Sequence, residues 1–201
     1  MNKLRILLTG GGTGGHIYPL LAVAEELQKR DAELFYLGPE SEFTEEMKKA
    51  GVRVYLIWGG KWRRYGSILN FFDIFRMIGS FFQALALLFN LMPDAVFSKG
   101  GSGALPVVLA SSFYFVPIII HESDAVPGLA NLWSARLARR IAVAWGRAFT
   151  YFPAKKTAFL GNPTRSVLKT DVMDEEAAKR FWGFDSQKVL VFFWGGSRGS
   201  S

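Results

Sequence analysis

Residues 4–16 read Leu-Arg-Ile-Leu-Leu-Thr-Gly-Gly-Gly-Thr-Gly-Gly-His, a short apolar run that passes directly into glycines. The run is too short for the hydrophobic core of a signal peptide, and it is typical of a buried strand that ends in a tight turn. Helical periodicity begins at Ile17, so the glycines lie between a strand and a helix. Backbone N–H groups at the start of such a helix favour an anionic ligand such as a phosphate.

The alternation of a strand with a helix continues along most of the chain. Strands are expected where short runs are rich in Val, Ile and Phe, at 4–9, 33–37, 52–57, 95–98, 116–120 and 140–144. Helices are expected between them, over 17–30, 44–50, 68–91, 104–113 and 128–139. Strands that are apolar at nearly every position are buried on both faces, and helical connections imply parallel pairing. We therefore expect an α/β fold with a doubly wound, Rossmann-like parallel sheet.

The pattern changes after about residue 150. We expect residues 1–150 to form one Rossmann-like domain and residues 151–186 to be a connector, with a strand over 157–160 and a short helix over 174–181. Residues 188–194 repeat the strand signature and lead into Gly195-Gly196-Ser197. A strand and a glycine loop without a following helix cannot bury their apolar faces. Residues 187–201 are therefore interpreted as the start of a second Rossmann-like domain, and the chain as a fragment of a two-domain protein.

The composition excludes several classes of protein. Of the 201 residues, 50% are hydrophobic and 20% are charged, which excludes an intrinsically disordered chain. The absence of cysteine excludes disulfides, thiolate metal sites and a cysteine nucleophile, and it fits a reducing compartment such as the cytoplasm. A formal net charge of +7 favours an anionic partner. The basic residues are scattered and no recognition module occurs, so a nucleic acid is not the expected partner.

Polar or glycine-rich segments follow three of the predicted strands. Besides the first glycine loop, these are residues 99–103, Lys-Gly-Gly-Ser-Gly, and residues 121–124, His-Glu-Ser-Asp. Because the carboxyl ends of parallel strands share one edge of a sheet, we expect all three to converge on one cleft that holds pyrophosphate-bearing molecules. The two histidines of the chain, His16 and His121, both lie at this edge. The helix N-terminus beside His16 disfavours the imidazolium, which leaves a neutral imidazole able to accept a proton.

The first glycine loop also admits a dinucleotide-binding interpretation. Gly10, Gly12 and Gly15 fit the spacing G-x-G-x-x-G, although five glycines in six positions satisfy many patterns. The fingerprint needs an acidic residue at the end of the second strand, and Glu40 lies late for that role. The motif G-x-x-x-x-G-K-[ST] of P-loop NTPases does not occur. A dinucleotide-binding oxidoreductase is therefore kept as an alternative function.

Five motifs occur in order along the chain. They are Gly11-Gly12-Thr13-Gly14-Gly15-His16, Gly100-Gly101, His121-Glu122 with Val126-Pro127-Gly128-Leu129, Gly161-Asn162-Pro163-Thr164-Arg165, and Gly195-Gly196-Ser197. Together they resemble the MurG-like enzymes of glycosyltransferase family 28. The resemblance implies a GT-B fold and an inverting, metal-independent transfer of N-acetylglucosamine from UDP-N-acetylglucosamine to lipid I, the lipid-linked muramyl-pentapeptide acceptor of peptidoglycan synthesis. It implies no cofactor, and a chain that is inactive without its donor-binding domain. A membrane-anchoring acceptor half of a split glycosyltransferase is a further alternative.

The resemblance also implies roles for individual residues. His16 and Glu122 are the candidate catalytic residues, and His16 falls on the family's proposed base. The role of Glu122 follows from the chemistry of the transfer instead: it orients His121 or another ligand group, with a structural cap as the alternative. The candidate substrate-binding residues are Thr13, Gly14, Gly15, His121, Asp124, Arg165 and Ser197. Arg165 and the loop at Ser197 would neutralise the diphosphate of the departing UDP. Asp124 stands where the family usually has an amide, and Ser102 where it has a tyrosine. A carboxylate near a diphosphate is repulsive unless it is paired.

The segment 68–91 is apolar around most of a helix, and its polar residues form one narrow stripe. Its length permits a transmembrane span, but the strands on either side are expected in one sheet, which a spanning helix would separate. We therefore expect the helix to lie on an anionic membrane surface, with Lys61, Arg63 and Arg64 beside it. The alternative is a broadly buried helix that follows a solvated basic loop. The resemblance implies the same location, a peripheral protein on the cytoplasmic side of the cell membrane.

Overall fold

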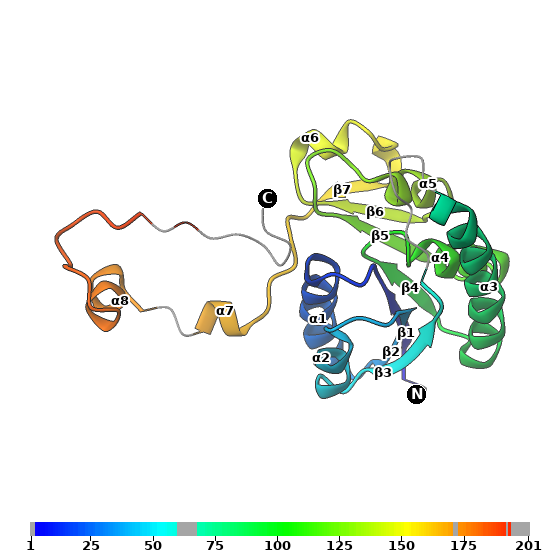
Figure 1. Ribbon diagram of the computed structural model, residues 1–201, viewed down its shortest axis with the longest axis horizontal. Coiled ribbons are helices and arrows are strands. Elements are labelled where there is room, and N and C mark those ends of the chain that lie inside the picture. The colour runs from blue at the N-terminus through cyan, green and yellow to red at the C-terminus, as the bar shows by residue number, and fades with distance from the viewer. Residues whose placement is uncertain (1–2, 60–67, 171–172, 192, 194–201) are drawn as a thin grey trace.

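The protein is described here by a computed structural model, which covers residues 3–59, 68–170, 173–191 and 193 (Figure 1). These residues form a seven-stranded sheet in the order β3-β2-β1-β4-β5-β6-β7, and every paired neighbour is parallel. The strands are β1 (Arg5–Thr9), β2 (Glu33–Pro39), β3 (Arg53–Ile57), β4 (Ala95–Ser98), β5 (Ile118–Glu122), β6 (Arg140–Val143) and β7 (Thr157–Phe159). The order reverses between β1 and β4, which confirms the predicted doubly wound fold.

Helices cover both faces of the sheet (Figure 1). On one face lie α1 (Gly14–Gln28) and α2 (Thr44–Lys49), and on the other lie α3 (Ile68–Leu91), α4 (Leu105–Phe113) and α5 (Leu129–Leu137). After the crossovers come α6 (Gly146–Phe149), the 3₁₀ turn η1 (Ala154–Lys156), α7 (Val167–Thr170) and α8 (Glu175–Phe181). Of these, α7 and α8 lie away from the sheet (Figure 1).

Two hydrophobic cores result from this layering. Successive strand residues point to opposite faces, so Leu7 packs with Leu88 of α3 while Leu8 packs with Ile17 of α1. All four side chains are at most 1% exposed. Burial of both faces of the central strands explains why their sequences are continuously apolar.

Most predicted elements end within two residues of the observed ones, and two differences affect the site. Helix α1 begins at Gly14 rather than Ile17, because the carbonyl oxygen of Thr13 already accepts the N–H groups of His16 and Ile17. Strand β5 runs to Glu122 rather than to residue 120, because His121 and Glu122 pair with β6. Gly14, Gly15 and His16 therefore form the first turn of a helix, and His121 and Glu122 belong to a strand.

The C-terminal segment differs more from its prediction. Helix α8 forms as expected, and the carboxylate of Asp174 caps it by accepting the N–H of Ala177 at 2.8 Å. No strand forms at residues 188–191 or 193, where Val189 and Phe193 are each 90% exposed. A strand needs a hydrogen-bonded neighbour, and the described residues provide none here. Ser197 and the loop around it lie outside the described residues, so the second domain stays a prediction.

Helix α3 is long and apolar enough over Asp73–Leu91 to cross a membrane, a test that uses length and composition only. Within that window 22% of the residues are buried, so the alternative of a broadly buried helix is wrong. Strands β3 and β4, on either side of α3, lie in one sheet as expected. The basic residues Lys61, Arg63 and Arg64 lie outside the described residues.

Candidate functional site

The first two glycine loops are in direct contact at the carboxyl edge of the sheet. The N–H of Gly11 donates to the carbonyl oxygen of Gly100 at 2.8 Å, and the N–H of Lys99 donates to that of Thr9 at 2.8 Å. Gly100 and Gly101 have φ angles of +84° and +87°, which only glycine adopts without strain. A Cβ atom on Gly101 would lie 2.9 Å from the Cα atom of Gly11. The predicted convergence of these two loops is confirmed.

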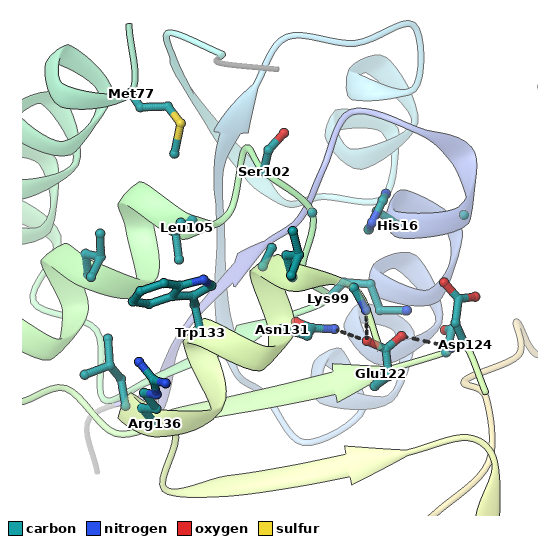
Figure 2. Close-up of a pocket in the computed structure, with 18 residues that line it drawn as sticks. His16, Met77, Lys99, Ser102, Leu105, Glu122, Asp124, Asn131, Trp133 and Arg136 are labelled. Atoms are coloured by element: carbon teal, nitrogen blue, oxygen red, sulfur yellow. Dashed lines mark hydrogen bonds between the residues drawn. The ribbon is translucent and has the colours of Figure 1, made fainter. Parts of the chain in front are cut away.

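A cavity of about 910 Å³ opens beside the crossing loops (Figure 2). Its lining comes from the start of α1, the β4–α4 loop, the turn after β5, and the helices α3, α4 and α5. The polar lining side chains are His16, Lys99, Ser102, Glu122, Ser123, Asp124, Asn131 and Arg136. The apolar ones include Met77, Leu105, Leu109, Leu129, Trp133 and Leu137. This volume and a largely apolar wall with a few polar groups are typical of a site for an organic ligand.

His16 lies on the cavity wall in the first turn of α1. Its Nδ1 atom is 2.7 Å from the hydroxyl oxygen of Thr13, which fixes the plane of the ring. Its Nε2 atom lies on the side of the β4–α4 loop, 3.0 Å from where a Cβ atom on Gly101 would stand. If Nδ1–H donates to Thr13, the lone pair of Nε2 is directed to the second glycine loop. The geometry suits a proton acceptor.

Glu122 is buried at the end of β5 and holds the turn that follows. Its carboxylate accepts the N–H of Asp124 at 2.9 Å, the N–H of Gly128 at 3.2 Å and the side-chain amide of Asn131 at 3.0 Å. The same amide also reaches the carbonyl oxygen of His121 at 3.2 Å. Glu122 therefore shapes one wall of the cavity through backbone hydrogen bonds, which favours the turn-capping alternative.

His121 does not meet His16 in the cavity. Its side chain lies near Phe97, with ring centroids 6.4 Å apart, and its Nε2–H donates to the carbonyl oxygen of Gly161 at 2.9 Å. Burial, together with the charge of Lys99, lowers the pKa of His121 to about 4, although the bond to Gly161 acts in the opposite direction. A neutral imidazole thus joins β5 to the segment that follows β7.

Arg165 lies on the outside of α1 rather than in the cavity. Its Nε atom donates to the carboxylate of Glu25 at 2.8 Å, and the backbone N–H and hydroxyl of Ser166 donate to the same carboxylate at 3.0 Å. Burial raises the pKa of the Glu25 carboxyl group, but the hydrogen bonds from Arg165 and Ser166 lower it more. The pKa of Glu25 therefore lies below its usual value. This cluster fastens the connector to the domain.

The remaining predicted residues lie near the first loop or the cavity. Gly15 and Asp124 line the cavity. Gly14 packs more closely, since a Cβ atom there would lie 3.2 Å from the ring of Phe43. The structure thus brings His16, Gly15, Glu122 and Asp124 together, and it places His121 and Arg165 elsewhere.

The cavity residues that the sequence did not indicate include two buried polar ones, Lys99 and Asn131, which are 3% and 4% exposed. Lys99 stands in a glycine-rich loop, where a lysine is normally solvated, and Asn131 is an amide inside a predicted helix. A polar residue at a helix position that should be buried is a usable signal for Asn131; the burial of Lys99 depends on how two distant loops cross. In the part of the chain that the structure describes, no three His, Asp or Glu side chains are grouped so as to hold a metal ion.

Comparison with known proteins identifies a family for most of the chain. Residues 6–143 match the description "Glycosyltransferase family 28 N-terminal domain". A relative in Lachnospira eligens is 38% identical over 197 residues, which is 98% of this chain and 55% of the relative. A relative in Treponema pallidum (strain Nichols) is 38% identical over 200 residues, which is 97% of this chain and 52% of the relative. The chain thus spans about half the length of these curated relatives.

Both relatives carry the same name, UDP-N-acetylglucosamine–N-acetylmuramyl-(pentapeptide) pyrophosphoryl-undecaprenol N-acetylglucosamine transferase. Among solved structures, Acinetobacter baumannii MurG matches with a TM-score of 0.67 at 26% identity, over 84% of this chain and 48% of that one. A UDP-N-acetylglucosamine 2-epimerase from Rickettsia bellii matches with a TM-score of 0.59 at 16% identity, over 80% of this chain and 45% of that one. The second likeness concerns the fold alone.

Proposed function

Because the chain belongs to glycosyltransferase family 28, we propose that it is the acceptor-binding part of an inverting glycosyltransferase. The reaction is transfer of N-acetylglucosamine from UDP-N-acetylglucosamine to lipid I, which yields lipid II in peptidoglycan synthesis. The observation that carries the proposal is the cavity beside the crossed glycine loops, with His16 and Lys99 on its wall. Relatives that are named for this reaction match nearly the whole chain, which supports a glycosyltransferase over a dinucleotide-binding oxidoreductase.

Each predicted domain has its own role in the proposed reaction. Residues 1–150 bind the acceptor, residues 151–186 connect, and residues 187–201 begin a donor-binding domain. His121 and Arg165 then fasten the connector, since their partners are Gly161 and Glu25. Ser197 keeps its proposed place on the donor-side loop.

His16 acts as the base of the proposed reaction. With Nδ1–H donating to Thr13, Nε2 takes the proton of the acceptor hydroxyl as its oxygen bonds to the anomeric carbon of the donor. The bond from that carbon to the UDP oxygen breaks on the opposite face of the sugar, so the configuration inverts. Glu122 acts as a positioning residue, because its carboxylate holds the turn that carries Asp124.

The first turn of α1 supplies the proposed attraction for the acceptor's diphosphate. Gly14 and Gly15 are the first two residues of this 15-residue helix, and Gly15 lines the cavity. N–H groups in the first turn of a helix have no partner within it, and the helix dipole places positive potential there. Glycine lets a phosphate approach this backbone closely.

An apolar path continues from the cavity, as a lipid-linked acceptor requires. A second hollow of about 650 Å³ lies between α3 and α4, and it shares Met77, Leu109 and Leu137 with the cavity. Its other walls include Phe81, Phe82 and Phe113. A ligand with a polar diphosphate head and a prenyl chain matches this succession of polar and apolar surface.

The outer side of α3 supports a peripheral position on the cytoplasmic side of the cell membrane. Exposed apolar side chains gather there, Phe82 at 62% and Phe89 at 66% among them. Two polar side chains of α3 instead turn inward: Ser80 is buried and donates to the carbonyl oxygen of Arg76 at 2.7 Å, and Gln83 accepts the N–H of Trp58 at 2.9 Å. Such a face favours a bilayer surface, and Lys61, Arg63 and Arg64 would contribute attraction to anionic lipid.

Binding to the chain itself tests the acceptor assignment. A lipid I analogue with a shortened prenyl chain and UDP-N-acetylglucosamine are each titrated calorimetrically into the 201-residue chain. We expect the analogue to bind, and His16→Gln to change its affinity by no more than about threefold, because the base acts on the hydroxyl in the transition state. Binding of the donor sugar nucleotide alone, or of a nicotinamide dinucleotide in place of the analogue, would contradict the proposal.

Transfer itself tests the role of His16. With the chain joined to the C-terminal half of the Lachnospira eligens relative, His16→Gln should lower kcat by at least about 100-fold, the usual contribution of a general base. An active fusion whose kcat is unchanged by His16→Gln would remove His16 from the mechanism.

A further inference from the structure

A buried cation stands on the cavity wall with no direct counter-ion. Lys99 is 3% exposed and lines the cavity. Its backbone N–H is bonded to Thr9, but among the residues that the structure describes no hydrogen bond or ion pair reaches its ammonium group. Most of the Lys99 side chain is enclosed by protein, and the residue lines the cavity that a ligand would occupy. Neither the proposed base nor the glycine loops account for a charged side chain at this position.

The titratable groups around Lys99 come from three parts of the fold. His121 and Glu122 are the last residues of β5, Asp124 lies in the turn after β5, and His16 comes from α1. Burial lowers the pKa of Lys99, while the two carboxylates act in the opposite direction. Figure 2 shows the lysine side chain extended below His16 toward Asp124, with Glu122 underneath.

The neighbouring carboxylates are unequally available to Lys99. Glu122 is committed to three N–H donors, those of Asp124, Gly128 and Asn131. Asp124 is exposed, and no hydrogen bond to its own carboxylate is found among the described residues. Lys99 is therefore balanced by charges nearby, yet its three N–H donors remain open to a ligand.

We propose that Lys99 binds a phosphoryl group of the molecule that occupies the cavity, and that Asp124 is a positioning residue for the Lys99 side chain. This deepens the proposed function and rests on it for the identity of the ligand. A lysine supplies a compact charge that suits a phosphate oxygen, and the first turn of α1 faces the same cavity. The assignment also explains why a carboxylate at position 124 is compatible with an anionic ligand, since the positive charge of Lys99 nearby offsets it.

Three ligands that each carry a diphosphate show whether the phosphoryl group bound by Lys99 belongs to the lipid-linked acceptor or to the sugar-nucleotide donor. They are inorganic pyrophosphate, farnesyl diphosphate and UDP. Each is titrated at constant ionic strength into the 201-residue chain and its Lys99→Met variant. We expect Lys99→Met to weaken pyrophosphate and farnesyl diphosphate by at least about tenfold, the usual range for loss of a charged hydrogen bond. Lys29→Met, which removes a lysine whose side chain is 60% exposed, serves as the control and should have no such effect.

A spectroscopic readout covers the case in which Lys99→Met does not fold. In the unsubstituted chain with ¹³C-methylated lysines, the Lys99 signal should move on addition of pyrophosphate. Asp124→Asn should lower the pKa that this signal reports, which a purely structural role of Asp124 would not do. Two results would overturn the proposal. One is undiminished pyrophosphate binding by a folded Lys99→Met variant, and the other is a Lys99 signal whose chemical shift does not change when pyrophosphate is added.

The arms of the experiment also separate this proposal from the proposed function. If farnesyl diphosphate binds and Lys99→Met has no effect, the acceptor assignment stands and the role of Lys99 falls. If Lys99→Met weakens pyrophosphate and UDP but not farnesyl diphosphate, the phosphoryl group belongs to the donor, and the acceptor assignment of the cavity fails while Lys99 keeps its role. If none of the three ligands binds, both fail.

Discussion

Gly11 and Gly100 lie 89 residues apart in the sequence, and a backbone hydrogen bond of 2.8 Å from the Gly11 N–H to the Gly100 oxygen joins them. This bond closes the two glycine loops against each other at the point where the strand order of the sheet reverses. The cavity, His16 and Lys99 all lie beside it. The crossing of the loops is therefore the structural basis of the candidate site.

Gly101→Ala tests that crossing. The variant places a Cβ atom against the backbone of Gly11 at a positive φ angle, so we expect the free energy of unfolding to fall by about 1–3 kcal/mol. Urea denaturation measures the loss. Gly146→Ala is the control, because a Cβ atom there has no neighbour within 4 Å. Equal stabilities of the two variants would mean that the loops do not cross as described.

His121 should make stability depend on pH. Its pKa is about 4 in the folded chain and 6.5 ordinarily, so between these values the unfolded chain binds more protons. The stabilisation is complete above pH 6.5 and is lost as the pH falls toward 4, by roughly 3 kcal/mol. Urea denaturation at pH 7 and pH 4 should show that His121→Gln, which keeps a donor for Gly161, removes this part of the loss. An identical pH dependence in both proteins would exclude a neutral buried His121.

Arg165 and Glu25 should be coupled energetically. A double-mutant cycle with Arg165→Ala and Glu25→Ala is expected to give a coupling of about 0.5–1 kcal/mol, because both side chains are partly exposed. Affinity for pyrophosphate should not change in Arg165→Ala. Zero coupling together with weakened pyrophosphate binding would return Arg165 to the substrate-binding role that its motif implies.

The exposed face of α3 should bind membranes. Phe82→Glu is expected to weaken binding to vesicles that contain phosphatidylglycerol by about tenfold or more, since burial of a phenylalanine contributes about 1.5–3 kcal/mol. Phe159→Glu on β7 removes an aromatic side chain of similar exposure, 63% against 62%, and should leave vesicle binding much less affected. Equal losses in both variants would show a general charge effect instead of a specific face, and no loss in Phe82→Glu would exclude the face altogether.

The sheet and its winding could be predicted because local patterns carry them: apolar runs mark buried strands, and intervening helical periods impose parallel crossovers. The position of the His121 side chain could not be predicted, because it depends on β5 continuing for two more residues in register with β6. A shift of one residue along a strand turns a side chain to the other face of the sheet. The partner of Arg165 is 140 residues away on α1, and no local pattern indicates such a pair.

The burial of Lys99 belongs to the same class of unpredictable features. A lysine among glycines is expected to be solvated. Lys99 is enclosed only because its loop crosses the first glycine loop. Likewise, the sequence predicted His16 and Glu122 at the carboxyl edge of the sheet. That the Glu122 carboxylate accepts backbone N–H groups depends on the conformation of the turn after β5, which the sequence does not show.

Amide chemical shifts of the chain, followed during a titration with farnesyl diphosphate, test the central claim most directly. The account predicts that the amides of residues 10–16, 99–102 and 122–124 shift together with one affinity, because these segments line or support one cavity. Shifts confined to the surroundings of Arg165, or the absence of shifts in both glycine loops, would contradict it.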